Sequence, residues 1–87
     1  MSNNDQLKEL QKIPGVGKSI AQNLIDIGIN TIDELKDKKP DQLYGELCVF
    51  QNTQVDRCML YVFRCAVYFA EEDIHDPEKL KWWNWKD

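Results

Sequence analysis

Apolar residues recur at helical intervals through most of this chain, and short polar or glycine-containing segments separate the apolar stretches. Leu10 and Ile13 supply the apolar side of a first short helix, which is expected over residues 4–12. A second helix is predicted after the turn Pro14-Gly15-Val16-Gly17, because apolar residues return there at three- and four-residue spacing. These apolar positions are Ile20, Ala21, Leu24 and Ile25.

Residues with known capping chemistry mark the limits of the next helices. Gly28 stands where a left-handed cap is expected to close the second helix. Thr31 and Glu34 have the spacing of a capping box, which predicts that a short helix starts there. Pro40 suits the first position of a further helix, which we expect to run to about Phe50.

A long apolar helix is predicted over about residues 54–72, with Thr53 as its cap. Few residues between Val55 and Ala70 are polar, so this helix is expected to be buried among the others. One stripe along it alternates cations and rings, which suits contact with solvent or with a nucleic-acid partner. Alternatively, its arginines pair with carboxylates such as Glu46 and cover the core with their stems. The stripe consists of Arg57, Tyr61, Arg64, Tyr68 and Glu71.

The segment over residues 77–87 is rich in tryptophan. The sequence Asp-Pro-Glu from Asp76 is expected to cap a last helix, and Trp82, Trp83 and Trp85 follow it. Three neighbouring indoles can form a platform on which bases stack, or they can seal a small core. Sealing the core is the interpretation that we favour for these tryptophans.

The chain has 87 residues, which is enough for one domain with a small core. Its 43% of hydrophobic and 30% of charged residues are typical of a globular protein. We therefore expect a single all-α domain over residues 1–87, a compact fold of five to six short helices packed around the helix over residues 54–72.

The turn between the first two helices has the chemistry of a phosphate site. Pro14 ends the first helix, and Gly15 and Gly17 can take positive φ and leave the backbone bare. Lys18 and Ser19 then open the next helix, whose first amide groups have no partner inside the helix and carry partial positive charge. A bare glycine turn that leads into a helix N-terminus can therefore receive a phosphate oxygen.

The order of residues in this region resembles the helix-hairpin-helix motif, over about residues 10–29. The matching residues are Leu10, Ile13, Gly15, Val16, Gly17 and Ala21. The resemblance implies that backbone amides of the turn grip the phosphates of DNA without reading its sequence. It also implies a fold similar to that of sterile-alpha-motif-like domains. The contacts implied by the resemblance are Gly15, Val16, Gly17, Lys18 and Ser19.

The charge of the chain bears on this interpretation. A net charge of −4 opposes strong autonomous binding to DNA, because neutralising phosphates drives such binding. The basic residues are unevenly spread, however, and those expected to assist the turn are Lys12, Lys18, Lys36, Lys38 and Lys39. A single motif binds weakly, so a partner protein or a homodimer is a further expectation.

Metal binding and catalysis have little support in the sequence. Cys58 and Cys65 are seven residues apart on one predicted helix, which is too far for a disulfide and awkward for one tetrahedral zinc ion. Together with Cys48 they are interpreted as small apolar core residues. His75 is the single histidine, and no nucleophile with a partnering base stands out. We predict no metal, no cofactor and no enzymatic activity.

Three stretches extend the resemblance to most of the chain: IPGVGKSIA, DRCMLYVFRCAVYFAEED and DPEKLKWWNWKD. Together they resemble the small bacterial pathogenicity-locus family of helix-hairpin-helix proteins, from about Leu7 to Asp87. The resemblance implies a fold and a link to nucleic acid, but no reaction.

The leading expectation is a non-catalytic module that binds DNA without sequence specificity, in DNA repair or recombination. The alternative is a protein–protein interaction adaptor that uses the same helical fold without nucleic acid; acidic composition and a single motif favour it. The chain has neither a signal-peptide pattern nor an apolar run long enough to span a membrane, so a cytoplasmic, bacterial protein is expected.

Overall fold

The computed structural model describes residues 3–86, and this part of the chain is helical without strands. It contains four α-helices and three single-turn 3-10 segments, rather than the five to six helices expected from the sequence. The difference arises because the segments after Thr31 and Asp76 are four residues long and do not continue beyond one turn. The elements are α1 (Asn3–Leu10), α2 (Lys18–Asp26), η1 (Ile32–Leu35), α3 (Pro40–Gln51), α4 (Cys58–Glu71), η2 (Pro77–Leu80) and η3 (Trp82–Trp85).

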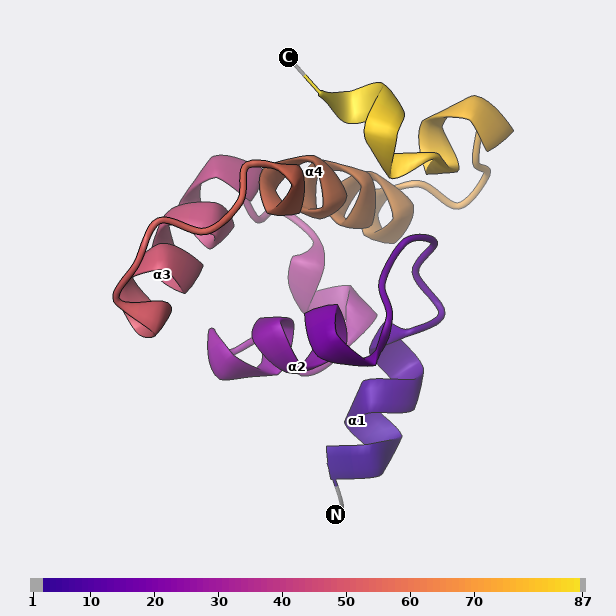
Figure 1. Ribbon diagram of the computed structural model, residues 1–87. Helices are drawn as coiled ribbons and strands as arrows, with labels where there is room; N and C mark the ends of the chain where they lie inside the picture. The colour runs from indigo at the N-terminus through magenta and orange to yellow at the C-terminus, as the bar shows by residue number, and fades with distance from the viewer. Residues whose placement is uncertain (1–2, 87) are drawn as a thin grey trace.

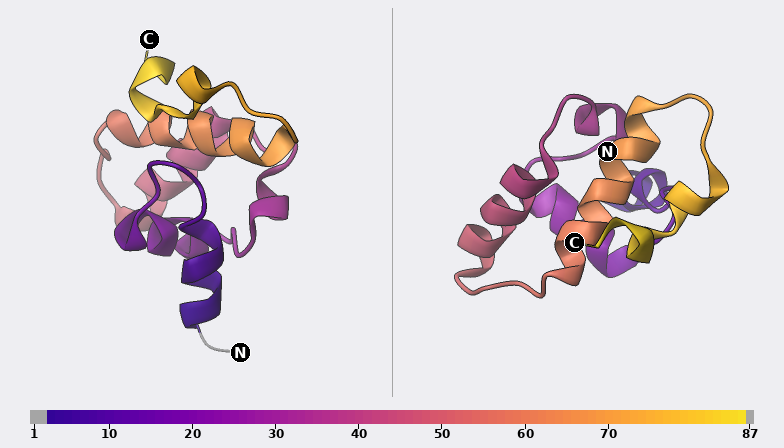
Figure 2. Two further views of the ribbon diagram at one scale, coloured as in Figure 1. Left: turned by 90° about the vertical axis from the view of Figure 1, so that its right-hand side faces the viewer. Right: turned by 90° about the horizontal axis from the view of Figure 1, so that it is seen from above.

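Helix α4 lies in the middle of the molecule (Figure 1). The pair α1 and α2 lies on one side of it, and the C-terminal segment with η2 and η3 covers the opposite side (Figure 2). Helix α3 packs against α4 and also contacts α2. Because α4 touches α3, η1, η2 and η3, it holds together parts of the chain that are far apart in the sequence.

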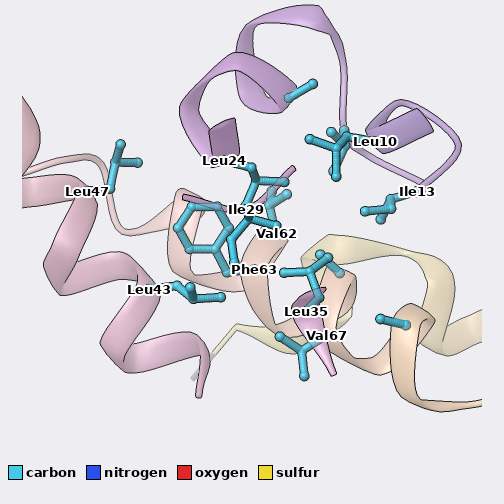
Figure 3. Close-up of a cluster of buried hydrophobic side chains, with 14 of the residues drawn as sticks. Leu10, Ile13, Leu24, Ile29, Leu35, Leu43, Leu47, Val62, Phe63 and Val67 are labelled. Atoms are coloured by element: carbon cyan, nitrogen blue, oxygen red, sulfur yellow. The ribbon is translucent and has the colours of Figure 1, made fainter. Parts of the chain in front are cut away.

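The core gathers aliphatic side chains from every α-helix around one aromatic ring (Figure 3). Phe63 of α4 has no exposed surface, and its side chain lies among leucine and isoleucine side chains of other segments and the valines of α4 itself. The expectation that the central helix is buried is confirmed, since half of its residues are buried. The fully buried side chains are Phe63, Leu10, Ile13, Leu24, Leu35, Leu47 and Cys65.

Gly28 closes α2 in the way that its position predicts. It has φ of 93° and donates its amide to the carbonyl of Ile25 at 3.0 Å. The amide of Ile29 donates to the carbonyl of Leu24 at 2.8 Å. These two bonds form a Schellman motif, which satisfies the last carbonyls of the helix.

The other predicted caps are also present. Thr31 accepts a hydrogen bond from the amide of Glu34, and the carboxylate of Glu34 accepts from the amide of Thr31 at 3.0 Å. Pro40 occupies the start of α3. Asp76 accepts from the amide of Glu78 at 3.0 Å and so caps η2.

The start of the central helix differs from the prediction. Helix α4 begins at Cys58 rather than near residue 54, and Thr53 does not cap it. The residues before it are extended along α3: the hydroxyl of Tyr44 donates to the carbonyl of Val55. Asp56, one residue before the N-cap Arg57, supports the start of the helix instead, because its carboxylate accepts a hydrogen bond from the amide of Cys58 at 2.8 Å.

The C-terminal segment covers the middle of the cation-and-ring stripe, at Arg64 and Tyr68, which is therefore not the free edge expected from the sequence, whereas Arg57 and Glu71 at its ends are exposed. Arg64 donates from Nη1 to the carbonyl of Trp85 at 2.6 Å. The hydroxyl of Tyr68 accepts from the amide of Asp76 at 2.8 Å, and its ring lies 5.5 Å from that of Trp85. The interpretation of the tryptophans as part of the packing holds for Trp82, which packs against the core, whereas Trp83 is 49% exposed.

Candidate nucleic-acid interface

A short loop joins α1 to α2, and two buried side chains anchor it. Ile13 and Val16 are 1% and 5% exposed. Between them, Pro14 and Gly15 form a tight turn in which the amide of Val16 donates to the carbonyl of Ile13 at 3.1 Å. Gly15 has φ of 85°, which favours glycine. Gly15 thus uses the positive φ that glycine can take.

The amide of Val16 is therefore used inside the loop. The resemblance implied that Val16 contributes its backbone N–H to phosphate, together with its neighbours. In the structure this N–H already has an acceptor, and the side chain is buried. Val16 holds the loop in place, and the amides without a partner inside the helix belong to the exposed residues after it.

Gly17 differs from Gly15 in both conformation and surroundings. It has φ of −91° and ψ of −171°, an extended conformation that any residue adopts, so the positive φ that glycine can take is not used at this position. A Cβ placed on Gly17 would meet no described atom within 4 Å. Neither the backbone nor the packing of the described chain requires glycine here, and the surface is open to another molecule.

Helix α2 starts at this bare position without a cap. No side chain of the described residues caps it at Gly17, and its first turn holds no acidic residue. The first helical bond runs from the amide of Ala21 to the carbonyl of Gly17 at 2.9 Å. The amides of Gly17, Lys18 and Ser19 precede that bond and have no partner inside the helix. All three residues are exposed.

The predicted basic residues divide into two groups that the structure keeps apart. Lys18 is exposed at the first position of α2, and Lys12 is exposed in the loop, where it lies 3.6 Å from the carboxylate of Glu9. Lys38 and Lys39 line a cavity of about 230 Å³ together with Gly28, at the other end of α2.

The second basic group is therefore a helix length away from the loop. Helix α2 has nine residues, which span about 13 Å. Lys36, the remaining member of the cluster, lies 3.5 Å from the carboxylate of Asp33. The predicted cluster at Lys36, Lys38 and Lys39 is thus not assembled beside the glycine turn.

No pattern in the sequence indicates the contact between this loop and the C-terminal segment. A Cβ on Gly15 would lie 2.8 Å from Cδ1 of Trp82 and 3.5 Å from its Cγ. Trp82 begins η3, and its half-buried indole packs on the bare face of the glycine turn. Spacing along the chain relates neither residue to the other, because 66 residues separate them in the sequence.

The cysteines have three different environments. Cys65 is completely buried, and burial raises the pKa of its thiol to about 11. Cys48 is half-buried, but Cys58 is exposed, so the interpretation of all three as core residues is wrong for Cys58. A hydrogen bond to Asp56 raises the pKa of the Cys58 thiol. Among the described residues, no group of three histidine, cysteine, aspartate or glutamate side chains is placed to hold a metal ion.

His75 has a structural position. Its ring stacks on that of Phe69 with centroids 4.6 Å apart, and its Nε2–H donates to the carbonyl of Phe69 at 2.9 Å. These contacts fix the chain where it leaves α4. In the described part of the chain, no helix has both the length and the apolar character needed to cross a membrane.

The fold and this site define a small all-helical protein in which a glycine turn leads to an uncapped helix N-terminus. The family model described as pathogenicity locus (Cdd1) matches residues 3–87, and the chain belongs to this family. The chain is also similar to the mitomycin resistance protein McrB of Streptomyces lavendulae. The two are 31% identical over 77 residues, which are 88% of this chain and 70% of that protein. No solved structure gives a significant match.

Proposed function

We propose that α1, the loop and α2 form a helix-hairpin-helix motif through which this chain binds the phosphate backbone of DNA, without catalysis and without sequence specificity. The observation that carries the proposal is that nothing in the fold requires a glycine at Gly17. The residue lies at the N-terminus of α2, and neither its φ nor its packing accounts for the missing side chain. Close approach of an outside group to the backbone does account for it.

The electrostatics at the N-terminus of α2 also favour binding of an anion. The amides of Gly17, Lys18 and Ser19, which have no partner inside the helix, carry the partial positive charge of a helix N-terminus. The ammonium group of Lys18 adds a full charge beside them. The chain as a whole is acidic, with a pI near 4.9, so binding is expected to be weak and confined to this spot.

The first experiment is an NMR titration of ¹⁵N-labelled protein with a short duplex and with a matched single strand, at ~50 and ~200 mM salt. We expect amide shifts at Gly17, Lys18 and Ser19 that shrink at the higher salt. The Val16 amide should move less, because it donates inside the loop. If the three amides do not move at the lower salt, the chain does not bind DNA through this loop.

Two glycines give a matched pair of variants for the same question. Gly17→Ala adds a methyl group where the phosphate is expected, and it should weaken binding about tenfold, the loss of one charge-assisted hydrogen bond. Gly45→Ala is the control, because a Cβ on Gly45 in α3 also meets no described atom within 4 Å. Equal affinity of the two variants would contradict the proposal.

The two groups of lysines are tested in the same way. Lys18→Gln should weaken binding and lower the salt dependence by about one phosphate contact. Lys38→Gln should change neither, because Lys38 lies at the far end of α2. The reverse result would move the interface to the cluster of Lys36, Lys38 and Lys39.

A second candidate function, a protein-interaction adaptor, is favoured by the outer surface of α3. Val49 and Phe50 are 79% and 59% exposed, and a groove of about 550 Å³ beside them is lined by Tyr44 and Cys48. Exposed apolar surface of this kind is typical of protein interfaces. If this function holds, sedimentation should show self-association that Val49→Asp abolishes, while Gly17→Ala leaves it intact.

A further inference from the structure

A small apolar pocket adjoins the glycine turn. It has a volume of about 320 Å³ and lies where α2, the start of α4 and η3 meet. Its walls are formed by Ile20, Met59, Val62 and Trp82, and Gly15 of the turn lines its edge. The pocket therefore opens next to the amides that are proposed to hold phosphate.

Asp56 is the one charged residue of the pocket lining in the described chain. Its carboxylate accepts a hydrogen bond from the amide of Cys58 at 2.8 Å. This bond, together with one from the Cys58 side chain, lowers the pKa of the Asp56 carboxyl. Asp56 is therefore ionised at neutral pH and offers the pocket an acceptor of hydrogen bonds only.

Trp82 adds one hydrogen-bond donor near the turn. Its Cδ1, the atom nearest to the Cβ position of Gly15, is bonded to the indole Nε1. This Nε1–H has no hydrogen-bond acceptor within residues 3–86. It is accessible to solvent, because every buried side-chain nitrogen or oxygen of the described residues has a partner. By contrast, Nε1 of Trp85 donates to the carbonyl of Lys79 at 2.7 Å.

We propose that this pocket receives one unpaired nucleobase that carries an amino group, next to the phosphate held at Gly17. The inference rests on the proposed DNA binding and names its preferred substrate, single-stranded DNA or a frayed end. Ligand pockets start at about 300 Å³, so this one suits a small flat ring rather than a larger ligand.

The chemistry of the lining selects among possible occupants. Apolar walls and a carboxylate disfavour a phosphate group, whereas an uncharged aromatic ring can stack on indole. Asp56 can accept from the amino group of cytosine, as carboxylates do in base recognition. Thymine has no amino group, so it cannot donate such a hydrogen bond to the carboxylate of Asp56. Bases inside a duplex cannot enter the pocket unless they leave the stack, so a single strand is preferred.

The test compares three fluorescein-labelled single strands of equal length: oligo-dC, oligo-dT and an abasic strand with the same phosphates. Anisotropy at ~50 mM salt should show the tightest binding for oligo-dC. Oligo-dT should bind about fivefold more weakly, the value of roughly one hydrogen bond, and the abasic strand should bind more weakly still. Equal affinity of oligo-dC and the abasic strand would show that no base enters the pocket.

Asp56→Asn separates recognition of the base from the structural role of this residue. Asparagine keeps an acceptor for the amide of Cys58, so the hydrogen bond at the start of α4 is retained. It also presents an amide donor, which pairs with the O4 acceptor of thymine. The preference for oligo-dC over oligo-dT should therefore disappear or reverse. Asp41→Asn, which changes an exposed carboxylate of α3 outside the pocket, should keep the wild-type preference.

The remaining outcomes are also decisive. If Asp56→Asn keeps the full preference for oligo-dC, the carboxylate does not select the base and the inference is wrong. If wild-type protein binds none of the three strands, the proposed phosphate site is wrong, and this inference, which rests on it, is wrong as well. If the abasic strand binds as well as oligo-dC, the phosphate site stands and only the base pocket is lost.

Discussion

The indole of Trp82 packs directly against Gly15, so the C-terminal segment contacts the turn between α1 and α2, although 66 residues separate the two in the sequence. A Cβ on Gly15 would stand 2.8 Å from Cδ1 of Trp82, closer than real Cβ contacts allow. Gly15 is also held at φ of 85°. Two independent constraints thus require glycine at Gly15, whereas none of the kind applies at Gly17.

This difference predicts opposite results for two equal substitutions. Gly15→Ala should lower the free energy of unfolding by about 2–4 kcal/mol, the sum of strain at positive φ and overpacking against the indole. Gly17→Ala should change it by no more than about 1 kcal/mol, because the residue is extended and open. Urea unfolding followed by far-UV circular dichroism measures both. A loss of similar size in Gly17→Ala would mean that this glycine is structural and would remove the main support for the phosphate site.

Arg64 should hold the C-terminal segment on α4. Its Nη1 donates to the carbonyl of Trp85 at 2.6 Å, and hydrogen bonds from charged groups contribute about 1.5–3 kcal/mol. Arg64→Met keeps most of the apolar stem and removes the donor. We expect a loss of roughly 1–2 kcal/mol and a weaker near-UV circular dichroism signal from the tryptophans. An unchanged near-UV signal would show that packing alone keeps this segment in place.

Local signals in the sequence predicted much of the fold. The cap at Gly28, the capping box at Thr31 and the proline at the start of α3 depend on residues close in sequence. The burial of α4 followed from its composition, because an almost entirely apolar helix needs partners on all sides. The resemblance to the pathogenicity-locus family rested on distinctive stretches, and the match over residues 3–87 confirms membership of that family.

What the sequence did not predict depends on contacts between distant segments. The stripe through Arg64 and Tyr68 has the periodicity of an exposed face, but these two residues contact Trp85 and Asp76, which come later in the chain. The lysines at residues 36–39 were grouped with the glycine turn by charge alone, and the length of α2 keeps the two apart. The pocket beside Gly15 joins three elements, so no local pattern marks it.

The capping box is expected to act as a coupled pair. Thr31→Ala removes the acceptor for the amide of Glu34 and should lower the free energy of unfolding by about 1 kcal/mol. Glu34→Ala removes the acceptor for the amides of Asn30 and Thr31 and should have a similar effect. The double variant should lose less than the sum of the two, because the residues share one structure. Full additivity in chemical denaturation would show that the two bonds act independently.

The thiols are predicted to differ in reactivity because their burial differs. Cys58 is exposed, so a disulfide reagent should modify it in the folded protein at pH 8. The hydrogen bond to Asp56 raises the pKa of Cys58, which slows this reaction, and Asp56→Asn should accelerate it. Cys65 is fully buried and should react only when the chain unfolds. Rapid modification of Cys65 in the native protein would contradict the packing of η2 on α4.

The burial of the Cys65 thiol also predicts that the stability of the fold depends on pH. Burial raises its pKa from 9.0 in the unfolded chain to about 11 in the folded protein. Between these two values the unfolded chain releases the thiol proton while the folded protein keeps it, so alkali favours unfolding. The stability linked to Cys65 is complete below pH 9 and is lost as the pH rises toward about 11. Urea midpoints from pH 8 to 11 should fall more steeply for the wild type than for Cys65→Ala, which lacks the titrating group; parallel curves would assign the alkaline loss to other residues.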